Sequence, residues 1–263
     1  MSTDDLYLIT AATGKTGANA VRILREDGQR VRALVHSHDA RAEALAGLGA
    51  EIVTGDLLDF ASVSSALAGV TAAYFCYPIV PGLLDATAIF AQAATEAGVT
   101  AVVNMSQVSA RRDAKSHAAQ NHWLGERLLD RSAFATAHLR PTFFAEWLAW
   151  QWSRDDDGGV FRLPFADGRH APIAAVVGFP VRYEPVDIDT FADVLRVEAH
   201  GDYFVQHITN VAQDYRDGIF AGTNNLVEVI TGTPALTVEQ FAATNRDAFT
   251  TAGQAPAWAK VRA

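Results

Sequence analysis

LYLITAATGKTG, the stretch from Leu6 to Gly17, decides the fold of this chain. Its apolar start has the composition of a buried β-strand, and its small and polar end is typical of a phosphate-binding turn. One interpretation is a P-loop, because Gly14 is followed by lysine and threonine as in G-x-x-x-x-G-K-[ST]. That motif needs a glycine where Ile9 stands, so a site for a nucleotide triphosphate is disfavoured.

The competing interpretation is the dinucleotide fingerprint G-x-x-G-x-x-G, a tight turn that lets the backbone approach a pyrophosphate at a helix N-terminus. Here the fingerprint runs from Ala11 to Gly17, with alanine in place of the first glycine. An apolar helical face from Ala18 to Leu24 follows, and then an expected strand at Val31 to Val35. This βαβ context favours the fingerprint over a glycine-bearing turn without a ligand.

Strand and helix patterns continue to alternate through the first half of the chain. We expect strands at 51–54, 72–77, 101–105 and 135–139, and helices near 40–48, 60–67, 83–97 and 118–129. Such alternation predicts an α/β fold, a Rossmann-like doubly wound parallel sheet with helices on both faces.

The second half of the chain is less regular. We expect an aromatic-rich helix from Pro141 to Trp152 and a solvated loop from Asp155 to Gly159. Further helices are expected at 187–198, 203–215, 223–230 and 238–249, the last with Thr237 as its N-cap. The sequence thus predicts a dinucleotide-binding domain at 1–142 and a smaller, mostly helical substrate or partner region at 143–263.

The amino-acid composition argues against several classes of function. The chain has 21 Lys and Arg against 30 Asp and Glu, a net charge of -9, which argues against nucleic acid and anionic membrane surfaces as partners. A single cysteine, Cys76, excludes an internal disulfide and suits a reducing compartment. The polar N-terminus is unlike a secretory signal, and no apolar run is long enough to span a bilayer. We expect a cytoplasmic protein.

Ligands of doubly wound sheets bind beyond the carboxyl ends of the strands. The residues at those ends are therefore the candidates for cofactor binding. They are Ala11, Thr13, Gly14, Lys15, Thr16, Gly17, His36, Ser37, Asp56, Leu57, Tyr77, Pro78 and Ser106.

The end of the second expected strand bears on the cofactor. An NAD site usually has an acidic residue there, whereas the 2′-phosphate of NADP needs donors or positive charge. This chain has His36, Ser37 and His38, with Arg41 one helical turn on and Lys15 across the loop. NADP(H) is therefore favoured over NAD(H), the alternative being that the histidines merely face solvent.

Catalytic residues are harder to assign. Short-chain dehydrogenases commonly use a Tyr-x-x-x-Lys pair, and none of the three lysines here lies four residues after a tyrosine. Ser106 stands where those enzymes carry their serine, and His122 on the next expected helix is a candidate proton donor. The alternative for His122 is a histidine that packs near Trp123 or faces solvent.

Aromatic side chains concentrate around the start of the second half. They either pack in the core or roof an apolar pocket for a flat substrate such as a quinone or an enone, and we favour the core for most of them. The residues are Trp123, Phe143, Phe144, Trp147, Trp150 and Trp152.

The chain resembles the NmrA-like branch of atypical short-chain dehydrogenases. The resemblance lies in the Ala11–Gly17 turn, Val31–Val35, Gly55–Leu57, Asn104–Ser106 and Leu139–Thr142. It implies an NAD(P)-binding Rossmann domain, with a smaller C-terminal region that forms one wall of a cleft. Members of this family are NADPH-dependent reductases or proteins that bind the dinucleotide and regulate a partner.

Four departures from the family pattern stand out. Ala11 replaces the first glycine, which alanine tolerates if the backbone needs no positive φ. His36 stands where many NADP-binding members have arginine, and His122 where several reductases have lysine. The chain is also shortened around 174–180, and an uncovered sheet edge there would favour a homo-oligomer.

Two functions follow as hypotheses. The first is an NAD(P)H-dependent reductase of a small apolar carbonyl or quinone-type compound, with Ser106 and His122 as the catalytic residues. The alternative is a non-catalytic NADP(H) sensor that binds a protein partner. No metal is expected in either case.

Overall fold

The structure is a computed structural model that describes residues 5–165, 181–220 and 225–250. The chain divides into two compact units, Met1–Pro141 and Thr142–Ala263.

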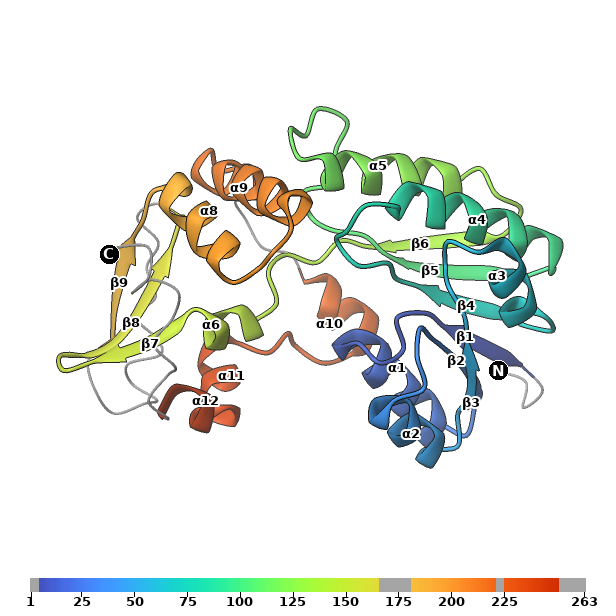
Figure 1. Cartoon of the computed structure of the whole chain (residues 1–263). Helices are drawn as coiled ribbons and strands as arrows, with labels where there is room; N and C mark the ends of the chain where they lie inside the picture. Colours follow the sequence, from blue (N-terminus) through green and yellow to red (C-terminus); the bar gives the residue numbers. More distant parts are fainter. Residues whose placement is uncertain (1–4, 166–180, 221–224, 251–263) are drawn as a thin grey trace. The chain divides into compact units, whose positions relative to one another are not determined.

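The first unit is built on a six-stranded parallel sheet (Figure 1). The strand order is β3-β2-β1-β4-β5-β6. The strands are β1 (Leu6–Ile9), β2 (Arg30–Val35), β3 (Glu51–Thr54), β4 (Ala72–Phe75), β5 (Ala101–Met105) and β6 (Ala135–Leu139). This confirms the predicted Rossmann-like doubly wound fold, whose strand order reverses between β1 and β4.

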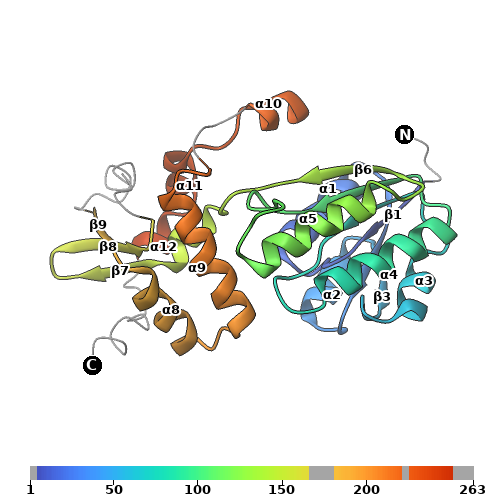
Figure 2. The ribbon, with the colours of Figure 1, turned by 90° about the horizontal axis from the view of Figure 1, so that it is seen from above.

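Helices cover both faces of this sheet, as Figure 1 shows. They are α1 (Lys15–Glu26), α2 (Ala40–Gly47), α3 (Phe60–Leu67), α4 (Leu83–Glu96) and α5 (His117–Leu129). Seen from above in Figure 2, α4 and α5 run side by side, and they pack on each other.

The alternation of side chains along the strands produces two cores. Leu6 and Leu8 of β1 lie in one apolar cluster with residues of α3, α4 and α5, whereas Ile9 lies in a second with Val21 of α1 and Leu45 of α2. Both clusters are buried, so the hydrophobic effect fixes which face each helix covers.

The second unit departs from the predicted pattern at its start. The helix expected from Pro141 to Trp152 was wrong, because α6 spans only Glu146–Trp150 and Trp152 begins a strand. That strand, β7 (Trp152–Asp155), pairs antiparallel with β8 (Gly158–Leu163), and β8 pairs parallel with β9 (Val181–Pro185). The predicted loop at Asp155–Gly159 is thus the turn region of a hairpin, in which Trp152 packs over Gly159.

The remaining elements of this unit are helical. They are α8 (Ile188–Val197), α9 (Asp202–Arg216), α10 (Leu226–Thr231), α11 (Val238–Thr244) and α12 (Arg246–Thr250). Thr237 caps α11 in a capping box with Gln240, but Asn245 separates α11 from α12 where we expected one helix. The start of the helix expected at 223–230 and the shortening around 174–180 lie outside the described residues.

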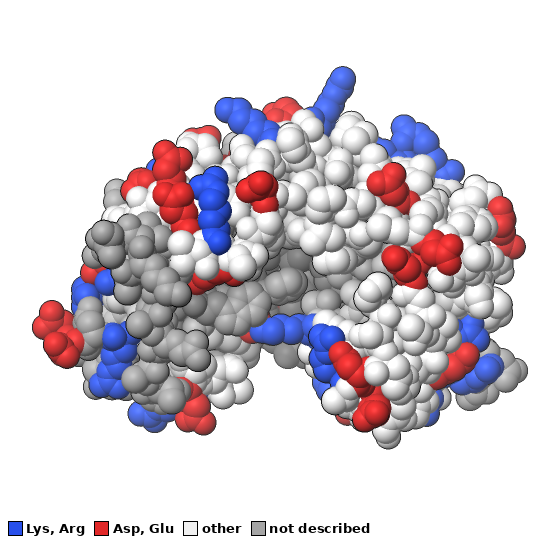
Figure 3. Space-filling view, viewed as in Figure 1, with Lys and Arg blue, Asp and Glu red and all other residues white. Residues whose placement is uncertain are grey.

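Charge is distributed without a single dominant patch on the face shown in Figure 3, where Lys and Arg side chains lie among Asp and Glu side chains. Among the described residues, no helix is long and apolar enough to cross a membrane.

Candidate cofactor and catalytic site

The fingerprint turn lies at the point where the strand order reverses. Gly14 N donates to Ala11 O at 2.9 Å, and α1 begins at Lys15 with Gly14 as its N-cap. Gly14 has no side chain that could cap this helix end, and a helix N-terminus attracts anions through its first amide groups.

Close packing explains the glycines of this turn. A Cβ on Gly17 would overlap the Ala11 carbonyl oxygen, and one on Gly14 would lie 3.1 Å from the same atom. Ala11 itself has a φ of 46°, in the left-handed region that favours glycine. The condition under which alanine would be tolerated without strain is therefore not met.

Polar side chains hold the turn against the neighbouring strand. Thr10 Oγ1 accepts from Cys76 N at 2.8 Å and lies 3.0 Å from Cys76 O, which joins the ends of β1 and β4. Tyr74 Oη donates to Thr16 Oγ1 at 2.9 Å, and burial raises the pKa of the Tyr74 phenol. Thr16 is thereby fixed on the first turn of α1.

The end of β2 presents exposed polar side chains. His36, Ser37 and His38 are all exposed, in agreement with their position at a rim. Asp39 caps α2, and its carboxylate pairs with Arg41 at 2.6 Å, which lowers the pKa of Asp39. The Arg41 guanidinium expected to serve a 2′-phosphate is thus shared with a carboxylate.

The other candidate residues also follow strands of the sheet. Asp56 after β3 is exposed and accepts from Leu58 N at 2.9 Å, and Leu57 packs against the core. Tyr77 after β4 is half-buried and donates to Pro81 O at 3.3 Å, whereas Pro78 is exposed. Because parallel strands end at one edge, the fold brings these residues to the same edge as the fingerprint turn.

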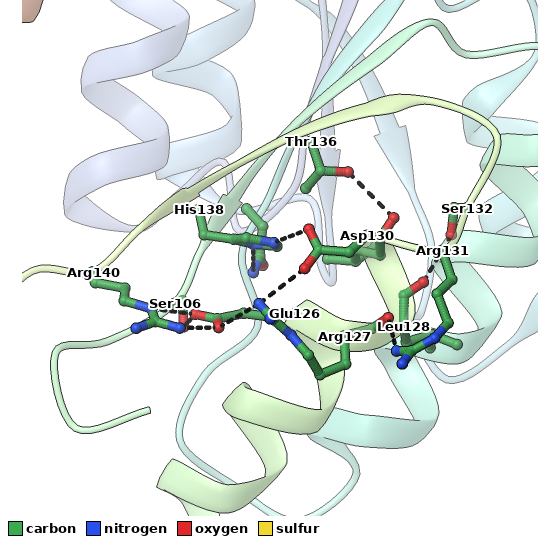
Figure 4. A network of polar contacts seen from close by, with 12 residues as sticks. Ser106, Glu126, Arg127, Leu128, Asp130, Arg131, Ser132, Thr136, His138 and Arg140 are labelled. Atoms are coloured by element: carbon green, nitrogen blue, oxygen red, sulfur yellow. Dashed lines mark hydrogen bonds and ion pairs between the residues drawn. The ribbon is translucent and has the colours of Figure 1, made fainter. Parts of the chain in front are cut away.

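Ser106, which follows β5, belongs to a polar network (Figure 4). Its hydroxyl donates to Glu126 Oε1 at 2.6 Å. The same carboxylate accepts from Arg140 Nε at 2.7 Å and from Arg140 Nη2. Glu126 lies on α5 and is fully buried, while Arg140 directly follows β6.

The charge of Glu126 is stabilised by its partners. Burial acts to raise the pKa of its carboxyl group, but the hydrogen bonds from Arg140 and Ser106 outweigh burial and lower it. Sequence reasoning missed Glu126 and Arg140. Their signal was an acidic residue four positions after His122 and a cation at the end of an expected strand, both of which are also common on solvated surfaces.

His122 lies on α5 and lines the same small cavity as Tyr77, which follows β4. Its side chain is 7% exposed, and burial lowers the pKa of the imidazole to about 4, so it is neutral at pH 7. The cavity has a volume of about 10 Å³ and is also lined by Asn104 and Thr87. That volume holds about one water molecule.

A second chain of contacts begins at the same cavity. Asn104 Nδ2 lies 3.0 Å from His138 Nδ1, and His138 Nε2 lies 2.9 Å from Asp130 Oδ1. Asp130 also pairs with Arg127 at 2.9 Å (Figure 4). These contacts join the end of α5 to β5 and β6.

The aromatic residues mostly serve packing in the second unit. Phe143 and Trp147 lie edge to face with ring centroids 4.9 Å apart, and Trp152 is buried against Phe161. Phe144 is 46% exposed. Among the described residues, no group of histidine, cysteine and carboxylate side chains is arranged to hold a metal ion.

Known proteins resemble this chain in sequence and in fold. Residues 3–130 match the model of the NmrA-like family. This match covers just under half of the chain and confirms the resemblance seen in the sequence.

Three proteins that are similar to nearly the whole chain are reductases by name. An NAD(P)H azoreductase of Xenophilus azovorans is 25% identical and covers 93% of this chain and 99% of its own. An NADPH-dependent quinone oxidoreductase of Escherichia coli has a TM-score of 0.76 at 19% identity, covering 91% and 99% of the two chains. A triphenylmethane reductase of Citrobacter sp. has a TM-score of 0.73 at 16% identity, covering 90% and 99%. At these identities the two structures show that the fold is shared.

Proposed function

We propose that this protein is an NAD(P)H-dependent reductase of a small apolar carbonyl or quinone-type compound. The observation that carries the proposal is the glycine turn at the uncapped N-terminus of α1, placed where the strand order reverses. The full-length similarity to an azoreductase and the shared fold of two further reductases support it.

The residues of the first unit fit a dinucleotide. The amides at the start of α1 would hold the pyrophosphate, and Gly14 and Gly17 let the turn pack closely against the start of this helix. His36, Ser37 and Lys15 would meet the adenosine ribose and its 2′-phosphate, which favours NADP(H). When bound, the reduced nicotinamide supplies a hydride. Residues 1–142 would form the cofactor domain, and residues 143–263 the substrate region.

The site carries no Tyr-x-x-x-Lys pair, and the two candidates for catalysis have limited proton chemistry. The Ser106 hydrogen is donated to Glu126, and His122 is neutral at pH 7. Such a site suits a hydride acceptor that delocalises negative charge by itself, as a quinone does, so that water completes the protonation. None of the proteins named above is a regulator, so the comparisons lend no support to the sensor hypothesis.

Titration calorimetry with NADPH, NADP⁺, NADH and NAD⁺ tests the cofactor, and NADPH oxidation by a panel of quinones and enones tests the reaction. We expect NADPH to bind most tightly and at least one quinone to be reduced. The matched control is Gly17→Ala, whose Cβ overlaps the Ala11 carbonyl and blocks the turn. No binding of any dinucleotide by the wild-type protein would contradict the proposal.

A further inference from the structure

Arg140 is exposed at the end of β6, although the carboxylate it pairs with is fully buried. Its side chain is 43% exposed and that of Glu126 is 0% exposed. Ser106 N donates to Leu139 O at 2.8 Å, so Ser106 and Arg140 lie next to each other at the carboxyl ends of β5 and β6. This is the edge at which ligands of doubly wound sheets bind.

The pairing with Glu126 uses only one side of the guanidinium. Nε and Nη2 point toward the carboxylate (Figure 4), and a planar guanidinium paired in this way turns Nη1 to the opposite side. Of the five N–H groups of an arginine, the two bonds to Glu126 leave three. In the described part of the chain, no residue accepts a hydrogen bond from Nη1.

Neither Ser106 nor His122 offers a charged donor here. The Ser106 hydrogen is committed to Glu126, so its oxygen can accept but not donate. His122 is buried and neutral at pH 7. The pKa of Arg140 is raised by its hydrogen bonds with Glu126, so its guanidinium stays charged.

We propose that the outward N–H groups of Arg140 bind the substrate oxygen that gains negative charge on hydride transfer, with Glu126 and Ser106 as the residues that position it. The inference rests on the proposed reductase function. The hydride and its electron pair come from the reduced nicotinamide, the carbonyl π electrons move to oxygen, and water supplies the proton. Arg140 keeps its own proton and acts only through charge and hydrogen bonds.

The clamp by Glu126 gives the guanidinium a fixed orientation before substrate binds. An arginine held by two parallel hydrogen bonds loses little further side-chain freedom when it meets a ligand. Preorganised donors of this kind contribute roughly 100-fold or more to kcat. Lysine cannot reproduce the fork, so it would keep the charge and lose the orientation.

A binding probe tests Arg140 without cofactor. The anion of 4-nitrophenol mimics a charged substrate oxygen and absorbs visible light, whereas the neutral phenol does not. We expect wild-type protein to bind the anion in preference and so to lower the apparent pKa of the bound probe. Arg140→Ala alone takes from the buried Glu126 carboxylate its closest cationic partner and leaves Arg127 Nη2 at 3.5 Å. The test variant is therefore E126Q/R140M, which removes both charges together. Its fold is checked by circular dichroism.

The double variant is expected to lose the preference for the anion, and Arg140→Lys to keep part of it. The matched control is Arg131→Met, which removes an exposed guanidinium that donates to Arg127 O at the C-terminal end of α5. This variant is expected to behave as the wild-type protein does. An unchanged shift in E126Q/R140M would overturn the proposal.

Measurements of turnover distinguish the proposed role of Arg140 from the proposed reductase function. If NADPH reduces a quinone in the wild-type protein, Arg140→Lys is expected to lower kcat at least tenfold with little change in KM or in NADPH affinity. An unchanged kcat would overturn the role of Arg140 while the reductase function stands. If the wild-type protein binds no dinucleotide, the reductase function fails, and the probe shift still reports on Arg140.

Discussion

The hydroxyl of Ser106 donates its hydrogen to the carboxylate of Glu126 at 2.6 Å. Ser106 is 4% exposed and Glu126 is fully buried, so this bond lies in the protein interior. A carboxylate can only accept, which fixes the direction of the bond. The serine at the end of β5 is therefore bound to a charged group, not presented outward as a donor.

This relationship predicts the stability of Ser106→Ala. Hydrogen bonds to charged groups contribute about 2 kcal/mol, and neutral ones about 1 kcal/mol. Ser109 is a matched control, because it is also buried but donates to the neutral amide oxygen of Gln107 at 2.7 Å. We expect Ser106→Ala to lower the free energy of unfolding in urea about twice as much as Ser109→Ala. Equal losses would show that the charge of Glu126 does not strengthen the bond.

Ala11 is strained in the fingerprint turn, since its φ of 46° suits glycine. Ala11→Gly is expected to raise the free energy of unfolding by roughly 0.5–1 kcal/mol, the relief of strain being partly offset by the entropy of a more flexible unfolded chain. Urea denaturation measures the change. Ala12→Gly at the next position is the control and is expected to destabilise, because Ala12 is buried and has no positive φ. A loss of stability in both variants would contradict the interpretation that Ala11 is strained.

His122 predicts a dependence of stability on pH. Its pKa is about 4 in the folded protein and near 6.5 in the unfolded chain, so the unfolded state binds more protons between these values. Its contribution is complete above pH 6.5 and is lost as the pH falls toward 4, by about 2–3 kcal/mol at pH 4.5. We expect wild-type protein to lose more stability than His122→Gln between pH 8 and 4.5, as measured by urea midpoints. Parallel losses in the two proteins would mean that His122 is not buried in its neutral form.

The pairing of Asp39 with Arg41 predicts that a change at Asp39 increases the preference for NADPH over NADH. Asp39→Asn removes the negative charge beside the proposed 2′-phosphate site and releases Arg41, while asparagine still caps α2. We expect the ratio of NADPH to NADH affinity to rise roughly two- to fivefold, since solvent screens an exposed charge and keeps its effect small. Calorimetry measures both affinities.

The control for this variant is Asp59→Asn, which changes the N-cap of α3 in the same way, and Asp59 has no arginine partner in the described chain. It is expected to leave the ratio unchanged. A shift of Asp39→Asn toward NADH would contradict the proposed placement of the 2′-phosphate.

The sheet of the first unit was predictable because its strands are short apolar runs separated by amphipathic helices, and local pattern fixes both. The second unit was less so. Pro141 to Trp152 has helical spacing of aromatic residues, but Trp152 pairs with Phe161 across a hairpin, and this contact depends on the turn at 156–157. Likewise β9 is a strand because it pairs with β8, and a local sequence pattern does not reveal this pairing between distant segments.

By itself the sequence determined the Rossmann-like sheet, the fingerprint turn and the residues at the strand ends, because each depends on neighbours close in the chain. Tertiary structure decided the rest. The positive φ of Ala11, the buried neutral state of His122 and the Ser106–Glu126–Arg140 network all arise where β5, α5 and β6, or β1 and α1, pack together. Burial and pairing set the charge and direction of these groups, and neither is encoded in any one segment.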